Sequence, residues 1–314
     1  MNFRISVIVR ARNEAEHLPR LIEGLAAQTI QPFEVVLVDS GSSDDTVAIA
    51  QQAGWVVSHI PPGDFTFGRA LNLGCSIARG EILVIMSAHV YPVRRDYLEN
   101  LTATLERNSE LAVYGRQVGD ERTHFSERMI MKQWFPEQRI LDQGHAFSNN
   151  ANSAIPRALW EKLRYNEDLT GLEDIDFSLR LLKMGGQVHY EHKAPVVHVH
   201  EENYSSVKRR YYREALAYKR IFPGENLSMG RALTLWFKNI SRDIAEASRQ
   251  AVLTRVWRSI FWFRSAQFYG AWSGFRDSSI TESDLQRRMY HPPGNKPSSD
   301  LDLSDSEMTI NYSH

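Results

Sequence analysis

Polar and charged side chains follow directly after short apolar runs near the start of this sequence. Residues 5–9 lead into Arg10-Ala11-Arg12-Asn13-Glu14, and residues 33–38 end at Asp39. The carboxylate of Asp39 can accept hydrogen bonds from a nucleotide base or a ribose hydroxyl, or it can act only as a turn former. Residues 10–14 contain no glycine, which excludes the glycine-rich pyrophosphate loop of dinucleotide-binding domains at this position.

Histidines are the residues that could bind a metal ion, because the sequence has a single cysteine. His89 follows the apolar run 82–86, and His198 and His200 alternate, so both point to one side of a strand. Imidazole suits Mn²⁺ or Zn²⁺, whereas Mg²⁺ prefers oxygen ligands. With His189 and His192 these residues could instead form a separate zinc hydrolase centre, although an H-E-x-x-H pattern is absent.

Two further charged sites each have two interpretations. Arg69 could pair bidentately with a phosphate, or it could be a surface charge on a helix. Glu173, Asp174 and Asp176 fall in the first turn of a predicted helix, where acids interact favourably with the helix dipole. Asp176 fits this structural role better than its two neighbours do.

The elements that must position these residues alternate along the first 118 residues. Apolar runs at 5–9, 33–38, 55–60, 81–86 and 111–118 are separated by amphipathic patterns such as Leu18, Leu21, Ile22 and Leu25. Connections of this length make the strands mostly parallel. We therefore expect a doubly wound α/β sheet that binds ligands at the C-terminal ends of its strands. Further on, we expect a helix over 173–184, ended by Gly185-Gly186, and short strands at 187–192 and 195–200.

Composition and charge exclude several classes of protein. The 314 residues are 42% hydrophobic and 24% charged, which excludes wholesale disorder. Lysine and arginine total 37 against 38 aspartates and glutamates, so no overall field attracts nucleic acid or a membrane. The single cysteine, Cys75, fits a reducing compartment. No apolar run is long enough for a signal peptide or a membrane span, so we expect a cytoplasmic protein, soluble or peripheral.

Residues 205–276 differ from the rest of the chain. They hold 14 lysines and arginines against 4 acids, together with four of the seven tryptophans. Aromatic residues recur at helical spacing from Trp257 to Phe275, which is typical of a membrane-surface helix or of a face packed on the catalytic domain or a second subunit. Nucleic acid is the least favoured partner. We expect residues 1–204 to form one domain, 205–276 a helical extension and 277–314, rich in proline, serine and aspartate, a mobile tail.

Four blocks, in order and at characteristic spacing, carry a resemblance to a known family. They are V-I-V-R-A-R-N-E, V-V-L-V-D-S-G-S-S-D-D-T, R-A-L-N-L-G and A-R-G-E-I-L-V-I-M. Together they resemble the inverting family-two glycosyltransferases, which have the GT-A fold. The resemblance extends to about residue 200, and the C-terminal part is similar to the bacterial rhamnosyltransferase-like branch.

The resemblance implies roles for residues near the ends of the predicted strands and at the start of the helix over 173–184. A nucleotide-diphosphate sugar would be bound by Ala11, Arg12, Asn13, Glu14, Asp39, Arg69, Ser87 and Ala88. Asp174, beside Glu173, would be the base that takes a proton from the acceptor hydroxyl; such a base is typically worth ~10²–10⁴ in rate. Apart from the resemblance, we expect the turn-rich residues Asn149, Asn150 and Asn152 to contact the acceptor.

The main departure from the family is at its D-x-D motif, where this chain has Ser87-Ala88-His89. The resemblance implies a divalent cation, Mn²⁺ or Mg²⁺, held here by His89 with His198 and His200. The alternative is that Arg10, Arg12 or Arg69 neutralises the diphosphate as a fixed cation.

These observations predict an inverting glycosyltransferase that moves a hexose or deoxyhexose to a glycan or lipid-linked acceptor in polysaccharide or cell-surface glycan synthesis. A peripheral position on the inner face of the plasma membrane would fit the basic, aromatic extension. With both D-x-D acids missing, a non-catalytic scaffold that binds a nucleotide sugar is the alternative. A sugar-phosphate nucleotidyltransferase is disfavoured because the glycine-rich loop after the first strand is missing.

Overall fold

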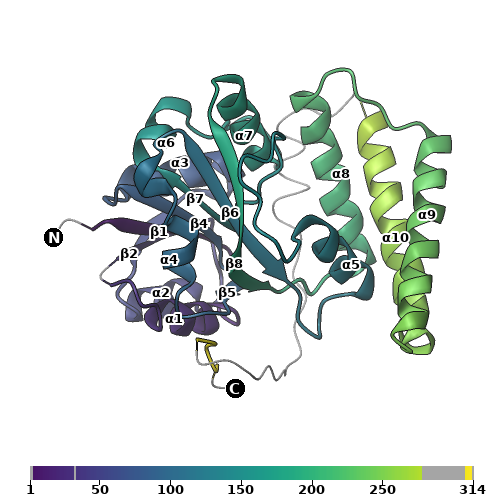
Figure 1. Ribbon diagram of the computed structural model, residues 1–314, viewed down its shortest axis with the longest axis horizontal. Helices are drawn as coiled ribbons and strands as arrows, with labels where there is room; N and C mark the ends of the chain where they lie inside the picture. Colours follow the sequence, from purple (N-terminus) through teal and green to yellow (C-terminus); the bar gives the residue numbers. More distant parts are fainter. Residues whose placement is uncertain (1–2, 32, 278–307, 313–314) are drawn as a thin grey trace.

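The computed structural model describes residues 3–31, 33–277 and 308–312. One mixed sheet, covered by helices on both faces, lies beside a group of three long helices (Figure 1). Its strands are β1 (Ile5–Ala11), β2 (Glu34–Asp39), β3 (Val56–His59), β4 (Ile82–Ser87), β5 (Val90–Pro92), β6 (Leu111–Val118), β7 (Asn152–Pro156) and β8 (Gln187–His198). The α-helices are α1 (Leu18–Ala26), α2 (Thr46–Gln52), α3 (Phe67–Ile77), α4 (Tyr97–Thr102), α5 (Phe125–Trp134), α6 (Arg157–Leu163), α7 (Glu173–Lys183), α8 (Tyr204–Ile221), α9 (Met229–Arg249) and α10 (Leu253–Arg276).

The strand order β3-β2-β1-β4-β7-β6-β8-β5 confirms a mostly parallel, doubly wound sheet. Strands β1 to β4 are parallel, as the alternating pattern predicts. The antiparallel strand β7, which we did not expect, lies between β4 and β6, so the fifth predicted strand does not neighbour the fourth. The expectation of two short strands at 187–192 and 195–200 is wrong. They form one strand, β8, whose register with β6 shifts between Gly115 and Gln117.

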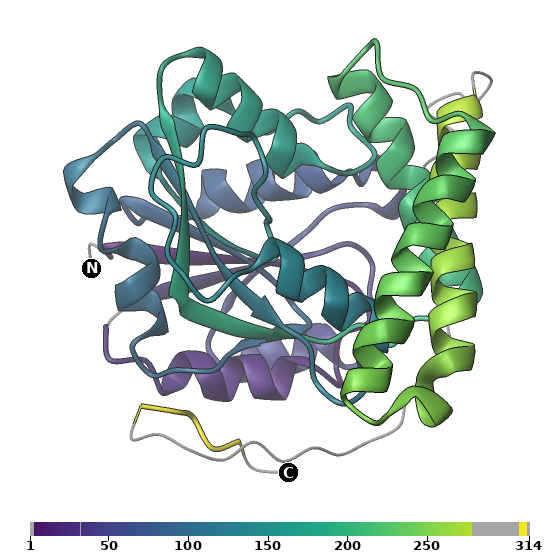
Figure 2. The same cartoon turned by 45° about the vertical axis from the view of Figure 1, so that its right-hand side comes forward.

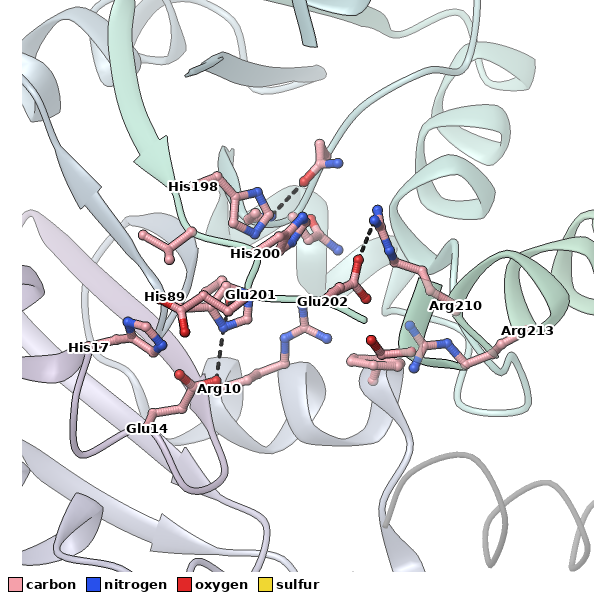
Figure 3. Close-up of a pocket in the computed structure, with 18 of the residues that line it drawn as sticks. Arg10, Glu14, His17, His89, His198, His200, Glu201, Glu202, Arg210 and Arg213 are labelled. Carbon is pink, nitrogen blue, oxygen red and sulfur yellow. Dashed lines mark hydrogen bonds and ion pairs between the residues drawn. The ribbon is translucent and has the colours of Figure 1, made fainter. Parts of the chain in front are cut away.

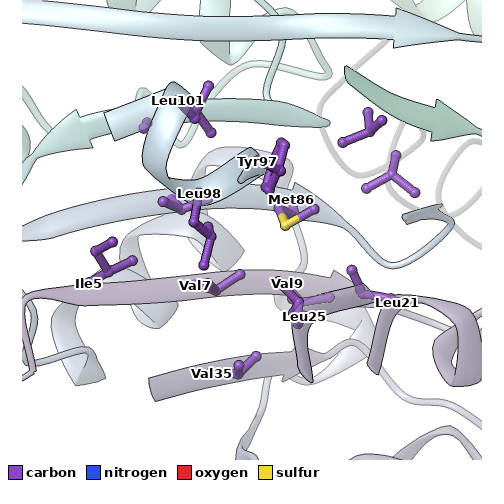
Figure 4. Close-up of a cluster of buried hydrophobic side chains, with 14 of the residues drawn as sticks. Ile5, Val7, Val9, Leu21, Leu25, Val35, Met86, Tyr97, Leu98 and Leu101 are labelled. Carbon is purple, nitrogen blue, oxygen red and sulfur yellow. The ribbon is translucent and has the colours of Figure 1, made fainter. Parts of the chain in front are cut away.

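The core explains why the sheet forms from near-continuous apolar runs. Successive residues of β1 point to opposite faces, and both faces are buried. Val7 and Val9 pack with Leu21 and Leu25 of α1, as predicted for that amphipathic stretch (Figure 4). Ile8 packs on the other face, in the cluster that contains Leu71 of α3. Because both faces are covered, polar residues of β1 and β4 gather at the strand ends.

In the extension, α10 lies between α8 and α9 (Figures 1 and 2). It runs antiparallel to α9 and parallel to α8, since Gly270 lies against Lys208 and Gly274 against Tyr212. Asn203 caps α8 by accepting hydrogen bonds from the backbone N–H groups of Ser205 and Ser206. Gly270 and Gly274 let α10 approach α8 closely, because a Cβ added at Gly270 would lie 2.4 Å from the backbone oxygen of Lys208. This close crossing fixes the position of α8 relative to the rest of the group.

A buried ion pair holds the extension together and joins it to the sheet domain. The Arg264 and Asp243 side chains are 1% and 0% exposed, and two nitrogens of the guanidinium donate to the two carboxylate oxygens at 2.7 and 3.0 Å. Arg264 also donates to the backbone oxygen of Ser126 in α5 and to Gln267. The pair therefore connects α9, α10 and α5.

The aromatic residues of the extension divide between packed and exposed positions. Phe275 packs near Tyr218 of α8, whereas Trp257 and Phe261 are exposed. Large apolar side chains are also exposed at every fourth position of α9, at Met229, Leu233 and Phe237. Across the described residues, no helix has the combined length and apolar character needed to span a membrane.

Part of the predicted tail is packed against the sheet domain. Residues 308–312 run beside α1 and the edge strand β5 (Figure 2), and Thr309 pairs with Arg94 in an isolated antiparallel bridge. Ile310 is buried, and the Tyr312 hydroxyl donates to the backbone oxygen of Pro92. The expectation of mobility therefore does not hold for 308–312, and residues 278–307 and 313–314 lie outside the described residues.

Candidate active site

A cleft of about 1050 Å³ opens where β1, β4 and β8 end. Its walls also include the start of α7 and one face of α8. His89, His198 and His200 gather on one side, and Arg213 reaches in from α8 on the side away from His17 and His89 (Figure 3). The predicted base pair Glu173-Asp174 lines the same cleft. Both groups of predicted catalytic and metal residues therefore meet in one place.

The three histidines form a compact cluster. One ring nitrogen from each of His89, His198 and His200 lies within 4.8 Å of the others. Among the described residues, His189 and His192 belong to no such group, so the separate zinc centre that would combine them with this cluster does not form. Ser87 Oγ lies 3.1 Å from His89 Nε2, which places the first residue of the altered D-x-D motif beside the cluster.

Each of these histidines has an acceptor at Nδ1. His89 Nδ1 lies 2.8 Å from Glu14 Oε1, His198 Nδ1 2.7 Å from Gln117 Oε1, and His200 Nδ1 2.7 Å from Glu127 Oε1. An acceptor at Nδ1 holds the proton on that nitrogen and leaves the lone pair on Nε2, as second-shell partners of metal-binding histidines do; at His89 this nitrogen also has Ser87 Oγ beside it. His198 Nε2 is buried and has no hydrogen-bond partner in the described structure.

The electrostatics of the cluster also fit a bound cation. Burial, together with His200 and His89, lowers the pKa of His198 well below its usual value, which keeps that ring neutral and able to coordinate. Burial works against a charge on His89, but Glu14 outweighs it and raises the pKa of His89, so a metal ion competes with a proton for this ring. Burial alone would raise the pKa of Glu127, yet Arg210 and His200 hold it below its usual range. Three imidazoles, two of them with a carboxylate at Nδ1, fit a first-row transition cation better than Mg²⁺.

The predicted base lies at the N-terminus of α7. Asp174 accepts hydrogen bonds from the backbone N–H groups of Asn150, at 3.0 Å, and Ile175, at 2.8 Å. Burial, followed by the charge of Glu173, raises the pKa of Asp174 to about 7. Leu172, just before this pair, has a φ of 57°, a left-handed conformation that costs a side chain roughly 1–2 kcal/mol. Such strain next to an ordered carboxylate is typical of functional sites.

The three asparagines assigned to the acceptor do not share one environment. Asn149 and Asn150 line the cleft, and Asn150 Nδ2 donates to Glu173 Oε1 at 3.3 Å. Asn152 does not reach the cleft, so its assignment is wrong. Its side chain is fully buried in β7, where it donates to the backbone oxygens of Arg116 and Ala194 and accepts from the Tyr97 hydroxyl.

The residues assigned to the donor are likewise divided. Asn13, Glu14 and Ser87 line the cleft, with Asn13 at a φ of 54° and its side chain accepting from the backbone N–H of Ser43. Asp39 lies outside the lining, and its carboxylate accepts from the backbone N–H groups of Gly41 and Ser42 as a turn former does. Ala11, Arg12 and Ala88 are also absent from the lining.

Arg69 has the structural role that we gave as its alternative. Its Nε donates to Glu167 at 3.2 Å and its Nη1 to the backbone oxygen of Asp64, and it does not line the cleft. Arg10, which we considered only as an alternative cation, does line the cleft, and its Nη1 lies 3.4 Å from Glu173 Oε1. A phosphate in this cleft would therefore meet Arg10 and not Arg69.

Helix α8 is the part of the site that the sequence did not indicate. Ser206, Arg209, Arg210 and Arg213 recur at helical spacing and line the cleft. Arg210 donates to Glu127 at 2.8 Å and also pairs with Glu202. The basic residues of 205–276, which suggested a membrane or a partner surface, are therefore also part of the cleft wall.

Comparisons with known proteins agree with this arrangement. Residues 6–164 match the family Glycosyl transferase family 2. The chain is 24% identical to the O-antigen chain rhamnosyltransferase RfbN of Salmonella typhimurium, over 67% of this chain and 70% of the relative. It is 23% identical to an uncharacterised glycosyltransferase of Rickettsia typhi, of which it spans 61%.

A solved structure shares the fold. The mannosyltransferase PcManGT from Pyrobaculum calidifontis, in complex with GDP-Man and Mn²⁺, superposes with a TM-score of 0.63 at 18% identity, covering 88% of each chain. The family match spans half of the chain, and the superposition extends over most of the rest. The chain belongs to glycosyl transferase family 2 and is a glycosyltransferase.

Proposed function

We propose that this glycosyltransferase moves a hexose or deoxyhexose from a nucleotide-diphosphate sugar to an acceptor hydroxyl with inversion, in the synthesis of a polysaccharide or cell-surface glycan. The observation that carries the proposal is the presence of Asp174 and the histidine cluster in one cleft. The rhamnosyltransferase relative and the mannosyltransferase bound to GDP-Man support a sugar of this class and a nucleotide donor.

The chemistry follows from a single displacement. The acceptor hydroxyl attacks the anomeric carbon as its proton passes to Asp174, and the bond from that carbon to the diphosphate oxygen breaks. Backbone N–H groups from Asn150 and Ile175 hold the carboxylate in place for this transfer. Arg10 lies close enough to Glu173 to offset part of the negative charge beside the base. A cation held by His89, His198 and His200 would supply electrostatic stabilisation of the departing diphosphate.

The donor and the cation can be tested together. A panel of UDP-, GDP- and dTDP-sugars, each with and without Mn²⁺, is screened for thermal stabilisation, because a ligand that binds the native state raises apparent stability. Hydrolysis or transfer of the stabilising donor then tests turnover. If no nucleotide sugar stabilises the protein under either condition, the proposal is wrong.

The histidine cluster predicts the metal preference. His198→Ala removes one of three ligands, and we expect it to abolish the stabilisation by Mn²⁺ or Zn²⁺, which at 100-fold excess over Kd is worth ~2.7 kcal/mol for the wild type. Binding is measured directly by the electron paramagnetic resonance of free Mn²⁺ and by Co²⁺ absorption. His189→Ala is the matched control, since His189 is on the same strand but outside the cluster. Equal metal binding by both variants would refute the assignment.

We also propose that the exposed face of α9 and α10 contacts an anionic membrane surface. Leu233 and Phe237 are 57% and 67% exposed, and the exposed cations Arg231, Lys238 and Arg258 lie on the same two helices. Apolar side chains beside cations are typical of helices that lie in the interface of anionic bilayers. Residues packed on a second copy of the chain would show the same exposure.

Vesicle flotation distinguishes a membrane surface from a second subunit as the partner of this face. Leu233→Glu/Phe237→Glu is expected to release the protein from anionic vesicles, since each change places a negative charge at the surface that contacts lipid. Leu141→Glu, a change at another exposed leucine, is the control. If the wild type does not float, and the double variant instead lowers the mass measured by light scattering, the face binds another subunit and the membrane proposal fails.

A further inference from the structure

The arginines that α8 presents to the cleft differ in how they are paired. Arg210 is bound by Glu127 and Glu202, so its charge is balanced within the protein. Arg213, one turn further along, makes no ion pair with any described residue, and its Nε is buried without a hydrogen-bond partner. Arg213 therefore brings into the cleft a charge without a direct ion-pair partner and an unused donor, although Glu214 beside it feels that charge.

Arg10 is a second arginine with unsatisfied hydrogen-bond donors, and it contacts the same aromatic ring as Arg213. The guanidinium of Arg10 is 4.7 Å from the centre of the Phe67 ring, and that of Arg213 is 4.8 Å from the same ring. Arg10 Nε and Nη1 are also buried without a hydrogen-bond partner, although Glu173 lies 3.4 Å from Nη1. One aromatic ring thus contacts two guanidinium groups, and Arg10 Nε and Nη1 and Arg213 Nε are buried without a hydrogen-bond partner in the described structure.

Two neighbouring arginines with unsatisfied donors destabilise the protein unless a ligand binds to them. Buried donors without acceptors and neighbouring like charges both cost free energy. An oxyanion would supply the missing acceptors and offset the repulsion, and the planar guanidinium matches phosphate in a bidentate geometry. A phosphate group offers at least three acceptor oxygens to these two arginines, whereas a carboxylate offers only two. Phosphate is the ligand that fits this pair.

The position of the pair indicates which substrate carries that phosphate. Arg10 contacts Glu173, the neighbour of the base, and a Cβ added at Gly171 would lie 3.6 Å from Arg213 Nε. The Thr170 hydroxyl donates to the backbone oxygen of Arg213, which joins α8 to the loop before the base. In an inverting displacement the base and the acceptor lie opposite the departing diphosphate. Cations beside the base are therefore on the acceptor side.

We propose that Arg213 and Arg10 form a phosphate-binding site for the acceptor, which carries a phosphate group close to the hydroxyl that is glycosylated. This inference rests on the proposed function, because it uses Asp174 to define the acceptor side. It makes α8 part of the substrate site and gives the enzyme a means to reject neutral sugars.

In the experiment, a nucleoside diphosphate first fills the donor site, and binding of a second, phosphate-bearing ligand is then measured. Wild-type protein is saturated with Mn²⁺ and with whichever of UDP, GDP and dTDP binds most tightly, and glucose 1-phosphate is titrated by calorimetry. We expect saturable binding that Arg213→Met weakens roughly 10–100-fold, since a lost hydrogen bond to a charged group is worth that much. The affinity of Arg213→Lys for glucose 1-phosphate should lie between those of the wild type and Arg213→Met. Methyl glucoside, which lacks the phosphate, should not bind measurably.

Arg255→Met removes an equal charge from the exposed surface of α10 and should bind glucose 1-phosphate as the wild type does. The proposal is overturned if glucose 1-phosphate does not bind, or if it binds equally to wild type and Arg213→Met. It is also overturned if Arg213→Met weakens nucleoside diphosphate binding instead, because the phosphate would then belong to the donor. Failure of every nucleoside diphosphate to bind would count against the proposed function, and the titration without it would still test the arginine pair.

Discussion

Replacement of Asp174 by Asn is expected to lower kcat by ~10²–10⁴ while the affinity for nucleoside diphosphate stays close to that of the wild type. The amide cannot take the proton of the acceptor hydroxyl, yet it occupies the same volume beneath the backbone N–H groups of Asn150 and Ile175. Turnover is measured under saturating donor and acceptor, and affinity by calorimetry. An unchanged thermal midpoint would show that the loss is not one of folding.

The same carboxylate predicts a pH dependence. A base must be deprotonated to act, and burial with Glu173 raises the pKa of Asp174 to about 7. Activity should therefore rise with pH through this value and level off above it. Asp176→Asn is the control, because Asp176 is in the same helical turn but pairs with Arg180. Near-normal turnover by Asp174→Asn, or an equal loss in Asp176→Asn, would show that the base is elsewhere.

Arg264→Met should produce the largest loss of stability. It leaves Asp243 charged and buried without its partner, and removing one member of such a pair typically costs about 3–5 kcal/mol. Urea unfolding followed by circular dichroism measures the change. Arg258→Met, at an exposed position of the same helix, is the matched control and should change stability by no more than about 0.5 kcal/mol.

The double variant Asp243→Leu/Arg264→Met separates a lost charge pair from lost packing. With both charges removed, no uncompensated group remains, so most of the stability should return. If the single variant Arg264→Met unfolds at the same urea concentration as wild type, the pair does not hold the three helices together.

The sequence predicts the fold correctly where the hydrophobic pattern of a segment fits only one kind of secondary structure. The runs that became β1, β2 and β4 are bounded by polar residues, and three of the four motif blocks overlap these strands, whereas R-A-L-N-L-G lies in α3. Strand β7 was missed because Asn152-Ser153 interrupts its apolar character, although tertiary packing buries both residues. The break expected between 192 and 195 reflects Pro195, which β8 accommodates where its register with β6 shifts.

The site was predictable where the chemistry depends on local spacing. The alternation of His198 and His200 places them on one side of the chain, and the family resemblance implies that they meet His89. Their acceptors Gln117 and Glu127 are more than 70 residues away in the sequence, and only the folded chain brings them together. Arg69 and Asn152 matched patterns that fit either a functional or a structural role, and their contacts in the folded protein give them the structural one.

Helix α8 belongs at once to the three-helix group and to the cleft. The boundary near residue 204, which the fold suggests, therefore does not coincide with the edge of the catalytic apparatus. Truncation there would remove Arg213 and also Arg210, the partner of Glu127, which orients His200. A minimal active fragment of this enzyme must extend through α10, since Gly270 and Gly274 provide the surface on which α8 rests.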